Sequence, residues 1–396
     1  MISVAEGRDR IAALMEPVGT EIIPLAEAAG RVLRAPVRAE RDQPPFAASA
    51  MDGYAIRHAD LAAGATLRVT GAIAAGHYQP SRIGPGEAMR IFTGAPLPDG
   101  ADHILIQEDT APATGRDQIT ISPGHETQSY VRPAGGDFRA GHEIPAPRRI
   151  GTAEIGLFAA MNAPRITVSR RPVVALIATG DELVWPGDTP RPDQIIASNN
   201  FALKAMFEAQ GAEARLLPIA ADRSDALMAV FDLCGDADLI VTMGGASVGD
   251  HDLVQSVARD RGLDLSFYKM AMRPGKPLMA GRMGRIPMIG LPGNPVSSIV
   301  CAHVFVRPAI DALLGLGYTD LDIRDASLAT PLGANGPRAH YMRATVTMRD
   351  GTPHCTPHPR QDSALLSVLA ASNALLIRDP NAPAAAPGDP VKISYI

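Results

Sequence analysis

The stretch ADLIVTMGGASVGDHD, residues 237–252, constrains the fold of this chain more than any other. Residues 239–243 form a short apolar run, the kind found in strands that are buried on both faces. Small residues follow at 244–249, and apolar residues recur at helical spacing from Leu253 onward. The stretch therefore predicts a buried strand, a glycine-rich bend and a helix.

This bend is a candidate binding site. In open α/β sheets, ligands bind in the crevice outside the carboxyl ends of the strands. Glycines let the backbone approach a ligand closely, and amides at a helix start favour an anion. The carboxylates of Asp250 and Asp252 would repel a bare anion, so we expect a divalent cation to bridge the two.

The length, composition and charge of the chain limit the classes of protein to which it can belong. With 396 residues the chain is longer than one ordinary domain, and two to four domains are expected. Its hydrophobic content of 46% supports real cores, and only 4% aromatic residues means that these cores consist of aliphatic side chains. A formal charge of −5 and a pI of about 6.1 give no basic footprint. We therefore expect no nucleic-acid partner.

The cysteines and the N-terminus bear on location. Three widely spaced cysteines imply no disulfide framework and suit a reducing compartment. Charged residues from Glu6 to Arg10 exclude the apolar core of a signal peptide. We find no apolar run that approaches the roughly 20 residues of a membrane helix. We expect a cytoplasmic protein without a membrane partner.

Residues 1–168 are predicted to form a helical segment with a β-rich insertion. Ser3 and Glu6 form a capping box, and a second helix is expected over Leu25 to Leu33. Short apolar pieces alternate with Gly/Pro turns over 43–134, and a helix capped by Thr152 is expected over 151–161. We expect an elongated, discontinuous N-terminal domain of residues 1–42 and 135–168, with a β domain of residues 43–134 inserted into it.

Strands alternate with helices from Pro172 to about Leu314. This order predicts a parallel sheet in a three-layer α/β/α domain, residues 169–317. Asn199 and Asn200 are expected to cap one of its helices, and Asn294 and Pro295 to begin another. The remainder, 318–396, reads as a small β-barrel-like domain.

Carboxylates recur at the ends of these elements. Glu182, Asp222 and Asp252 each follow a predicted strand, and Asp52 lies in the inserted module. Mg²⁺ prefers one or two carboxylates together with phosphate oxygens and water, and groups at strand ends can converge on one crevice. The alternative is that Asp222 and Asp252 simply stabilise helix starts and that Asp52 and Thr93 lie in ordinary turns.

Cations and a helix start complete the candidate site. Arg273 and Lys276 flank Pro274-Gly275 in MRPGKP, a stiff turn that suits an oxyanion, although solvated surface charge is the alternative. The pattern fails the phosphate-binding P-loop, and no G-x-G-x-x-G follows a strand. LPGNPVSS at 291–298 gives a rigid turn into a helix start, which favours an anion.

Six motifs together resemble one family. The chain is similar to the MoeA-type molybdopterin molybdenumtransferases, the molybdenum insertases of molybdenum-cofactor biosynthesis, which include the E domain of gephyrin. The motifs stand in the family's order. They are SAMDGYAIR (49–57), RIFTGAPLP (90–98), ATGDEL (178–183), MGGASVGDHD (243–252), MRPGKP (272–277) and GLPGNPVSS (290–298).

The resemblance implies a fold and a set of site residues. It implies the four parts described above and a homodimer whose active site combines the α/β domain of one subunit with the inserted domain of the other. Arg273 stands where relatives commonly have Lys, and Arg343, Arg360 and Ser363 are further oxyanion candidates. The implied catalytic residues are Asp52, Thr93, Glu182, Asp222 and Asp252. Glu182, Asp222 and Asp252 are also the implied metal ligands, and the implied binding residues are Gly244, Gly245, Ser247, Gly249, Arg273, Lys276, Pro292, Gly293, Asn294, Pro295, Ser297 and Arg343.

The resemblance also implies a reaction. The family's substrates are molybdate and adenylylated molybdopterin, the cofactor is Mg²⁺, and AMP is released as molybdenum is bound by the dithiolene. Partners would be a molybdopterin adenylyltransferase and apo-molybdoenzymes. Three alternatives stay open: a molybdopterin adenylyltransferase, a non-catalytic molybdopterin-binding scaffold, and a paralogue that handles tungstate.

Overall fold

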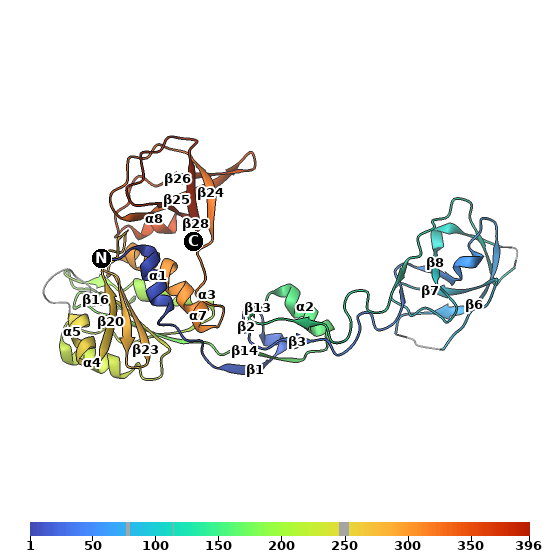
Figure 1. Ribbon diagram of the computed structural model, residues 1–396, viewed down its shortest axis with the longest axis horizontal. Coiled ribbons are helices and arrows are strands. Elements are labelled where there is room, and N and C mark those ends of the chain that lie inside the picture. The colour runs from blue at the N-terminus through green and yellow to red at the C-terminus, as the bar shows by residue number, and fades with distance from the viewer. Residues whose placement is uncertain (77–79, 114, 245–252) are drawn as a thin grey trace.

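The protein is elongated (Figure 1). The computed structural model describes residues 1–76, 80–113, 115–244 and 253–396. An α/β body occupies one end with the C-terminal region above it, and a β module occupies the other end. A slender segment made of β1, β2, β3, β13, β14 and α2 lies between them. The predicted domain boundaries stay a prediction.

The α/β body is built on a six-stranded sheet of order β18-β15-β19-β23-β22-β20. The first four strands are parallel, as the alternation of elements predicted. The last two pairings, β23 with β22 and β22 with β20, are antiparallel, which was not predicted from the sequence, so β22 alone runs against the other five strands. The strands are β15 (Val173–Ala178), β18 (Glu213–Leu216), β19 (Leu239–Met243), β20 (Leu263–Tyr268), β22 (Met279–Met283) and β23 (Ile286–Leu291), with a short pair β16 (Leu183–Val184) and β17 (Ile195–Ile196) beside them.

Helices cover both faces of this sheet. Side chains of β15 alternate between two cores: Val174 and Leu176 face one, Val173 and Ala175 the other. The first core includes residues of α1, α3, α6, η4 and α7, and the second includes residues of α4 and α5. The three-layer prediction is confirmed. The helices are α1 (Val4–Ala12), α3 (Asn199–Gln210), α4 (Ser224–Asp232), α5 (Leu253–Asp260), α6 (Pro295–Cys301), the π-helical η4 (Ala302–Val306) and α7 (Arg307–Leu313).

The C-terminal region closes into a five-stranded barrel, because β25 pairs with both β26 and β27. The barrel has its own core, yet Tyr341 and Leu375 on its outer face belong to the main core of the α/β body. The short strand β21 (Met272–Arg273) leaves the body to pair with β25. The barrel elements are β24 (Ile323–Leu328), β25 (Ala339–Arg349), β26 (Thr352–Pro357), α8 (Leu366–Ala370), β27 (Ala374–Arg378) and β28 (Pro390–Tyr395).

The distal module is a six-stranded sheet of order β8-β5-β7-β6-β10-β9. Four of its strands match predicted apolar pieces, but β5 (Gly53–Ile56) lies in a stretch read as turn-rich. This strand is buried between β7 and β8. The other elements are β4 (Ala48–Ser49), η2 (His58–Asp60), β6 (Thr66–Ile73), β7 (Glu87–Ile91), β8 (His103–Ile106), η3 (Gln107–Asp109), β9 (Thr110–Pro112), β10 (Gln118–Ile121) and β11 (Val131–Arg132).

The intermediate segment corrects two predictions. Leu25 to Leu33 is not a helix: a single turn, η1 (Leu25–Glu27), is followed by a strand whose Val32 and Leu33 are buried by pairing with β13 and β14. The predicted helix at 151 exists as α2 (Thr152–Ala160), but Gly151 rather than Thr152 is its N-cap. The strands are β1 (Thr20–Pro24), β2 (Val32–Leu33), β3 (Val37–Arg38), β12 (Glu143–Ile144), β13 (Arg148–Arg149) and β14 (Arg165–Ser169).

One stretch is apolar enough to raise the question of a membrane. By length and composition Pro295–Leu313 passes for a spanning helix, contrary to our reading of the sequence, but 89% of it is buried inside the protein. It is the central core helix, interrupted by the π-helical turn η4. Its apolar character is explained by that burial.

Two neighbouring leucines test how the barrel is attached. Leu375 faces the α/β body and Leu376 faces the barrel interior, and both are fully buried. Each Leu→Ala change is expected to cost about 2–5 kcal/mol. In hydrogen exchange, Leu375→Ala should lower amide protection in α6 as well as in β27, whereas Leu376→Ala should lower it in the barrel strands alone. Equal loss of protection in α6 for both variants would contradict this packing.

Candidate functional site

A cavity of about 960 Å³ lies where the parallel strands end and α6 begins. Its walls come from the ends of β15 and β19, the start of α3 and the turn before α6. Seven of the predicted site residues line it: Glu182, Asp222, Gly244, Pro292, Gly293, Asn294 and Pro295. The carboxyl edge of the sheet is thus a hollow, as the first motif indicated.

Carboxylates form one side of this cavity. Glu182 and Asp222 both line it, and the Asp222 backbone N–H donates to Asp181 Oδ1 at 3.1 Å. Partial burial raises the pKa of Asp222, and the charges of Asp181 and Glu182 raise it further. Like charges that destabilise one another in this way are stabilised by a cation, so the arrangement fits Mg²⁺.

Glycine backbone, without side chains, forms another part of the cavity lining. Gly244 has φ +93°, and a Cβ placed on it would lie 2.7 Å from the carbonyl oxygen of Thr179. A Cβ on Gly293 would in turn lie 3.5 Å from Cα of Gly244. The ends of β15 and β19 therefore approach one another more closely than a side chain at position 244 allows, so only glycine suits that position, while Gly293 lies in ordinary van der Waals contact with it.

The turn into α6 is braced from two directions. Asn199 Nδ2 donates to the Gly293 carbonyl at 2.8 Å, which ties the turn to α3. Asn294 Nδ2 donates to Ser363 Oγ at 2.9 Å, and the Val296 N–H donates to the Ser363 carbonyl at 3.0 Å, which ties it to the barrel region. Ser297, predicted as a binding residue, is buried and does not line the cavity.

Cations lie beside this junction. Arg343 is fully buried, and its Nη2 donates to the Asp362 carbonyl at 2.9 Å, while Nε and Nη1 have no partner among the described residues. Burial and then the charge of Arg273 lower the pKa of Arg343. Burial, followed by four arginines led by Arg273, lowers the pKa of His340 to about 4. This neutral histidine therefore adds no charge to a region of positive potential.

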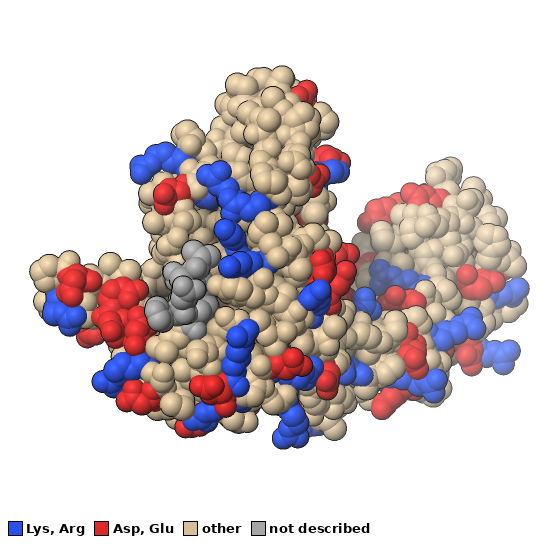
Figure 2. All heavy atoms as spheres, turned by 60° about the vertical axis from the view of Figure 1, so that its left-hand side comes forward, with Lys and Arg blue, Asp and Glu red and all other residues tan. Residues whose placement is uncertain are grey.

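These cations lack carboxylate partners. No ion pair between described residues includes Arg273, Lys276 or Arg343, and the first two are exposed. On the face drawn in Figure 2, acidic side chains gather at one side and basic side chains form a stripe running upward near the middle. Unpaired cations with free donors suit an oxyanion.

Asp52 and Thr93 lie together but far from this cavity. Asp52 Oδ1 accepts hydrogen bonds from the backbone N–H and the Oγ1 hydroxyl of Thr93, both at 2.8 Å. These hydrogen bonds lower the pKa of Asp52. The pair adjoins β5 in the distal module, at the opposite end of the chain from the α/β body (Figure 1). One chain does not bring the two halves of the predicted site together.

Four predicted residues lie outside the described part of the chain. They are Gly245, Ser247, Gly249 and Asp252. Among the described residues, no group of three or more His, Cys, Asp or Glu side chains is placed to hold a metal ion. Glu182 and Asp222 are the described carboxylates that could hold one here.

The sequence analysis missed several cavity residues. Thr179, Asn199 and Asn200 line the cavity, and Asp181 adjoins it. We predicted the two asparagines as caps of α3, but its N-cap is Ser198. A signal for Thr179 and Asp181 existed in ATGDEL, where they immediately precede Glu182.

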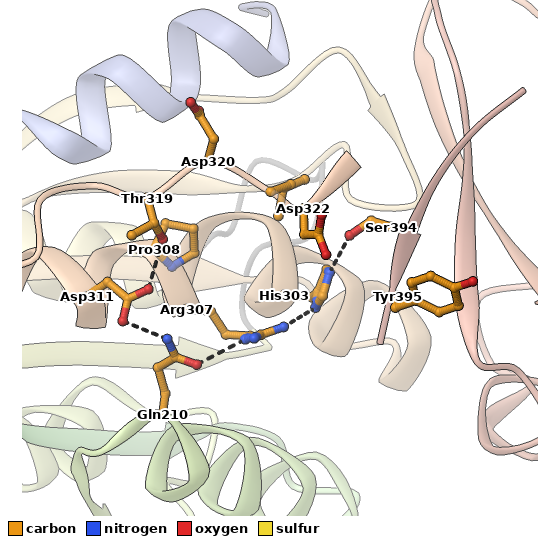
Figure 3. A pocket seen from close by; sticks show the side chains of 11 residues that line it. Gln210, His303, Arg307, Pro308, Asp311, Thr319, Asp320, Asp322, Ser394 and Tyr395 are labelled. Carbon is orange, nitrogen blue, oxygen red and sulfur yellow. Dashed lines mark hydrogen bonds between the residues drawn. The ribbon is translucent and has the colours of Figure 1, made fainter. Parts of the chain in front are cut away.

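A second, smaller cavity of about 280 Å³ provides a contrast (Figure 3). A chain of hydrogen bonds crosses it: Ser394 contacts His303, Arg307 donates to His303 and Gln210, and Gln210 donates to Asp311. None of the buried polar atoms left unpartnered in the described chain belongs to its lining. These hydrogen bonds link α3, α7 and β28 to one another. They occupy the polar groups of this cavity, which therefore differs from the larger one.

The chain was compared with known proteins. Three family models match it: the MoeA N-terminal region (domain I and II) over residues 2–162, a probable molybdopterin binding domain over 175–312, and the MoeA C-terminal region (domain IV) over 325–396. A molybdopterin molybdenumtransferase from Nostoc sp. is 36% identical over 84% of this chain and 78% of its own length. Molybdopterin molybdenumtransferase 2 from Mycobacterium tuberculosis is 36% identical over 95% of each chain.

Comparison with a solved structure identifies the same fold. The molybdopterin biosynthesis MoeA protein from Pyrococcus horikoshii superposes with a TM-score of 0.83 at 26% identity, covering 100% of this chain and 99% of its own.

The Asp52–Thr93 contact yields a test. Thr93→Val removes the hydroxyl donor and keeps the backbone donor, so the pKa of Asp52 should rise but stay below its ordinary value. A depressed carboxyl pKa stabilises the folded state above the unfolded pKa, and this stabilisation is lost as pH falls through the folded pKa. The variant should therefore lose less stability on acidification. An NMR titration of the Asp52 carboxyl measures the shift.

Thr66→Val, an exposed change in the same module, serves as the control. An unchanged Asp52 titration in Thr93→Val would contradict the contact.

Proposed function

The chain belongs to the molybdopterin molybdenumtransferase family, and from that premise we propose that it transfers molybdenum from molybdate to adenylylated molybdopterin with Mg²⁺-dependent release of AMP. The observation that carries the proposal is the cavity at the sheet edge: carboxylates line it, and its lining also includes Pro277, which follows the unpaired cation Lys276 in sequence. The substrate joins two phosphates to a heterocycle at each end. A large cavity with both kinds of charge suits such a molecule.

The carboxylate side would bind the phosphate bridge through the cation. Glu182 and Asp222 would hold Mg²⁺, with Asp252 as a further ligand. When bound, the ion supplies charge neutralisation and Lewis-acid polarisation at phosphorus. Asp181 fixes the backbone at Asp222 through its 3.1 Å hydrogen bond and so orients that ligand. Attack of water on the adenylyl phosphorus would break the bridging P–O bond, with the molybdopterin phosphate as the leaving group and AMP, which takes the oxygen of the water, as the other product. Attack by a molybdate oxygen would instead give adenylyl molybdate, and its hydrolysis would release AMP.

The basic side would hold the oxyanions. Arg343 has two unpartnered donor atoms, and Arg273 and Lys276 add charge from the adjoining turn. Tetrahedral molybdate and a terminal phosphate present the acceptors that such donors require. Ser363 already accepts from Asn294 and Val296, which holds it at the junction. The fork geometry of Arg273 favours a planar pair of oxygens over the point contact of Lys.

We further propose a homodimer that completes the site across subunits. Met51 and Phe92, which directly precede Asp52 and Thr93 in sequence, are exposed apolar residues, and so is Phe46 in the same part of the chain. The cavity of the α/β body carries exposed Ile195 and Ile196 on its wall, and exposed Phe201 lies nearby in α3. These two apolar surfaces lie at opposite ends of one chain (Figure 1), so they would meet between two copies.

The proteins that act before and after this reaction follow from its substrate and product. A molybdopterin adenylyltransferase would supply the substrate, and apo-molybdoenzymes would receive the product. We place the reaction in the cytoplasm, since all three cysteines are free and buried. A scaffold role would not require the carboxylate side of the cavity, and the presence of that side favours catalysis.

The first functional prediction concerns Glu182 and Asp222. Glu182→Gln and Asp222→Asn remove one negative charge each and should lower AMP release by about 100-fold or more, because cation binding supplies several kcal/mol. The assay follows AMP from adenylylated molybdopterin with molybdate and Mg²⁺. EDTA should abolish release from the parent, and added Mg²⁺ should restore it.

Asp225→Asn is the matched control, since this exposed carboxylate forms an ion pair with Arg223 and does not line the cavity. Parent-like turnover of Glu182→Gln and Asp222→Asn would refute the assignment.

The second functional prediction concerns the shared site. Asp52→Ala and Glu182→Ala proteins should each be inactive alone. After subunit exchange, mixed dimers would carry one intact site, so roughly a quarter of the parent activity should return. If the two residues acted within one chain, mixing would restore nothing. Size-exclusion chromatography with light scattering checks that exchange has occurred between dimers.

A further inference from the structure

Asn200 is a buried amide without a partner. It is the second residue of α3, is only 1% exposed, and lines the cavity. Its Nδ2 has no hydrogen-bond partner among the described residues. Its neighbour Asn199 donates to the Gly293 carbonyl, and the N-cap Ser198 makes no side-chain capping bond. Asn200 is therefore neither a cap nor a brace.

Thr179 presents a second free group in the lining of the same cavity. It is 3% exposed, lines the cavity at the end of β15, and its Oγ1 has no partner among the described residues. Its backbone N–H donates to the Met243 carbonyl at 3.1 Å, which ties the residue to the end of β19. The position of the hydroxyl is thus fixed by the sheet.

Unpaired buried polar groups cost stability. A donor left unsatisfied away from water costs more than a hydrogen bond contributes, so such groups are rare in native proteins. The smaller cavity of Figure 3 shows the usual outcome, with its polar groups bonded to one another. The large cavity keeps an amide and a hydroxyl of its lining free, and free groups of this kind are what a bound ligand pairs with.

We propose that Asn200, with Thr179, is a specificity-determining residue that donates a hydrogen bond to a ring acceptor of the heterocyclic part of the substrate. The proposal rests on the function proposed above. Ile195, Ile196 and Leu183 give the same cavity apolar surface for a flat ring. The carboxylates Glu182 and Asp222 repel ring acceptors, and they would bind the phosphates through the cation. The Asn200 amide is therefore the group that can donate to the ring.

Two rings share the chemistry that this pair recognises. Adenine and pterin both carry ring nitrogen acceptors at the edge of a flat π system. The test therefore uses two probes, AMP and 6-hydroxymethylpterin, and measures binding by calorimetry in the presence of Mg²⁺. Binding is measured without molybdate and without turnover. Failure of the proposed reaction would then be distinguishable from failure of this inference.

The variants are Asn200→Leu and Thr179→Val, each close in shape to the parent residue. Asn200→Leu should weaken one probe about tenfold and leave the other unchanged. Its melting temperature should stay the same or rise, since no hydrogen bond of the free protein is lost. Thr179→Val should weaken the same probe by a smaller factor. Loss of AMP binding would identify adenine as the recognised ring, and loss of pterin binding would identify the pterin.

Thr242→Val is the matched control, because its hydroxyl is also buried and unpartnered but does not line the cavity. It should leave both affinities unchanged. Asn200→Asp, which keeps the size and removes the donor, replaces Asn200→Leu if the latter is unstable. Unchanged affinity for both probes would overturn the inference, as would a fall in melting temperature without loss of binding.

Discussion

The site depends on how the barrel is anchored to the start of α6. Ser363 accepts hydrogen bonds from Asn294 and from the Val296 backbone, and β21 leaves the α/β body to pair with β25. Tyr341 and Leu375 bury the apolar part of the interface and belong to the main core of the α/β body. This anchoring places Arg343 and Arg273 beside a cavity whose carboxylates come from loops more than fifty residues away in sequence.

Much of the α/β body was predictable, because its strands are buried on both faces. The run at 239–243 could be read as a strand from five consecutive buried residues. The prediction of a helix over Leu25 to Leu33 was wrong, because the burial of this segment depends on partners that are distant in sequence. Its apolar spacing suits a helix, but Val32 and Leu33 are buried by strands that begin more than a hundred residues later. The antiparallel pairings of β22 with β23 and with the edge strand β20 were missed, since short apolar runs do not reveal strand direction.

The site could be predicted in part, and the limit has a physical cause. Glu182 and Asp222 follow strands of one parallel sheet, so topology alone brings them to one edge. Whether Arg343 faces that edge depends on the register of β25, where a shift of one residue would turn its side chain into the barrel. Asn200 was predicted as a cap because asparagine is common there. Its free amide becomes visible only when the partners of α3 are known.

The distal module hangs from the rest of the chain by two narrow ribbons, β3 with β12 and β4 with β11, each only two residue pairs long. Such a slender connection acts as a lever. A small twist at the ribbons is magnified into a long sweep at the far tip of the module (Figure 1). The alignment of that tip is therefore governed by whatever it rests against rather than by the stiffness of its own stalk.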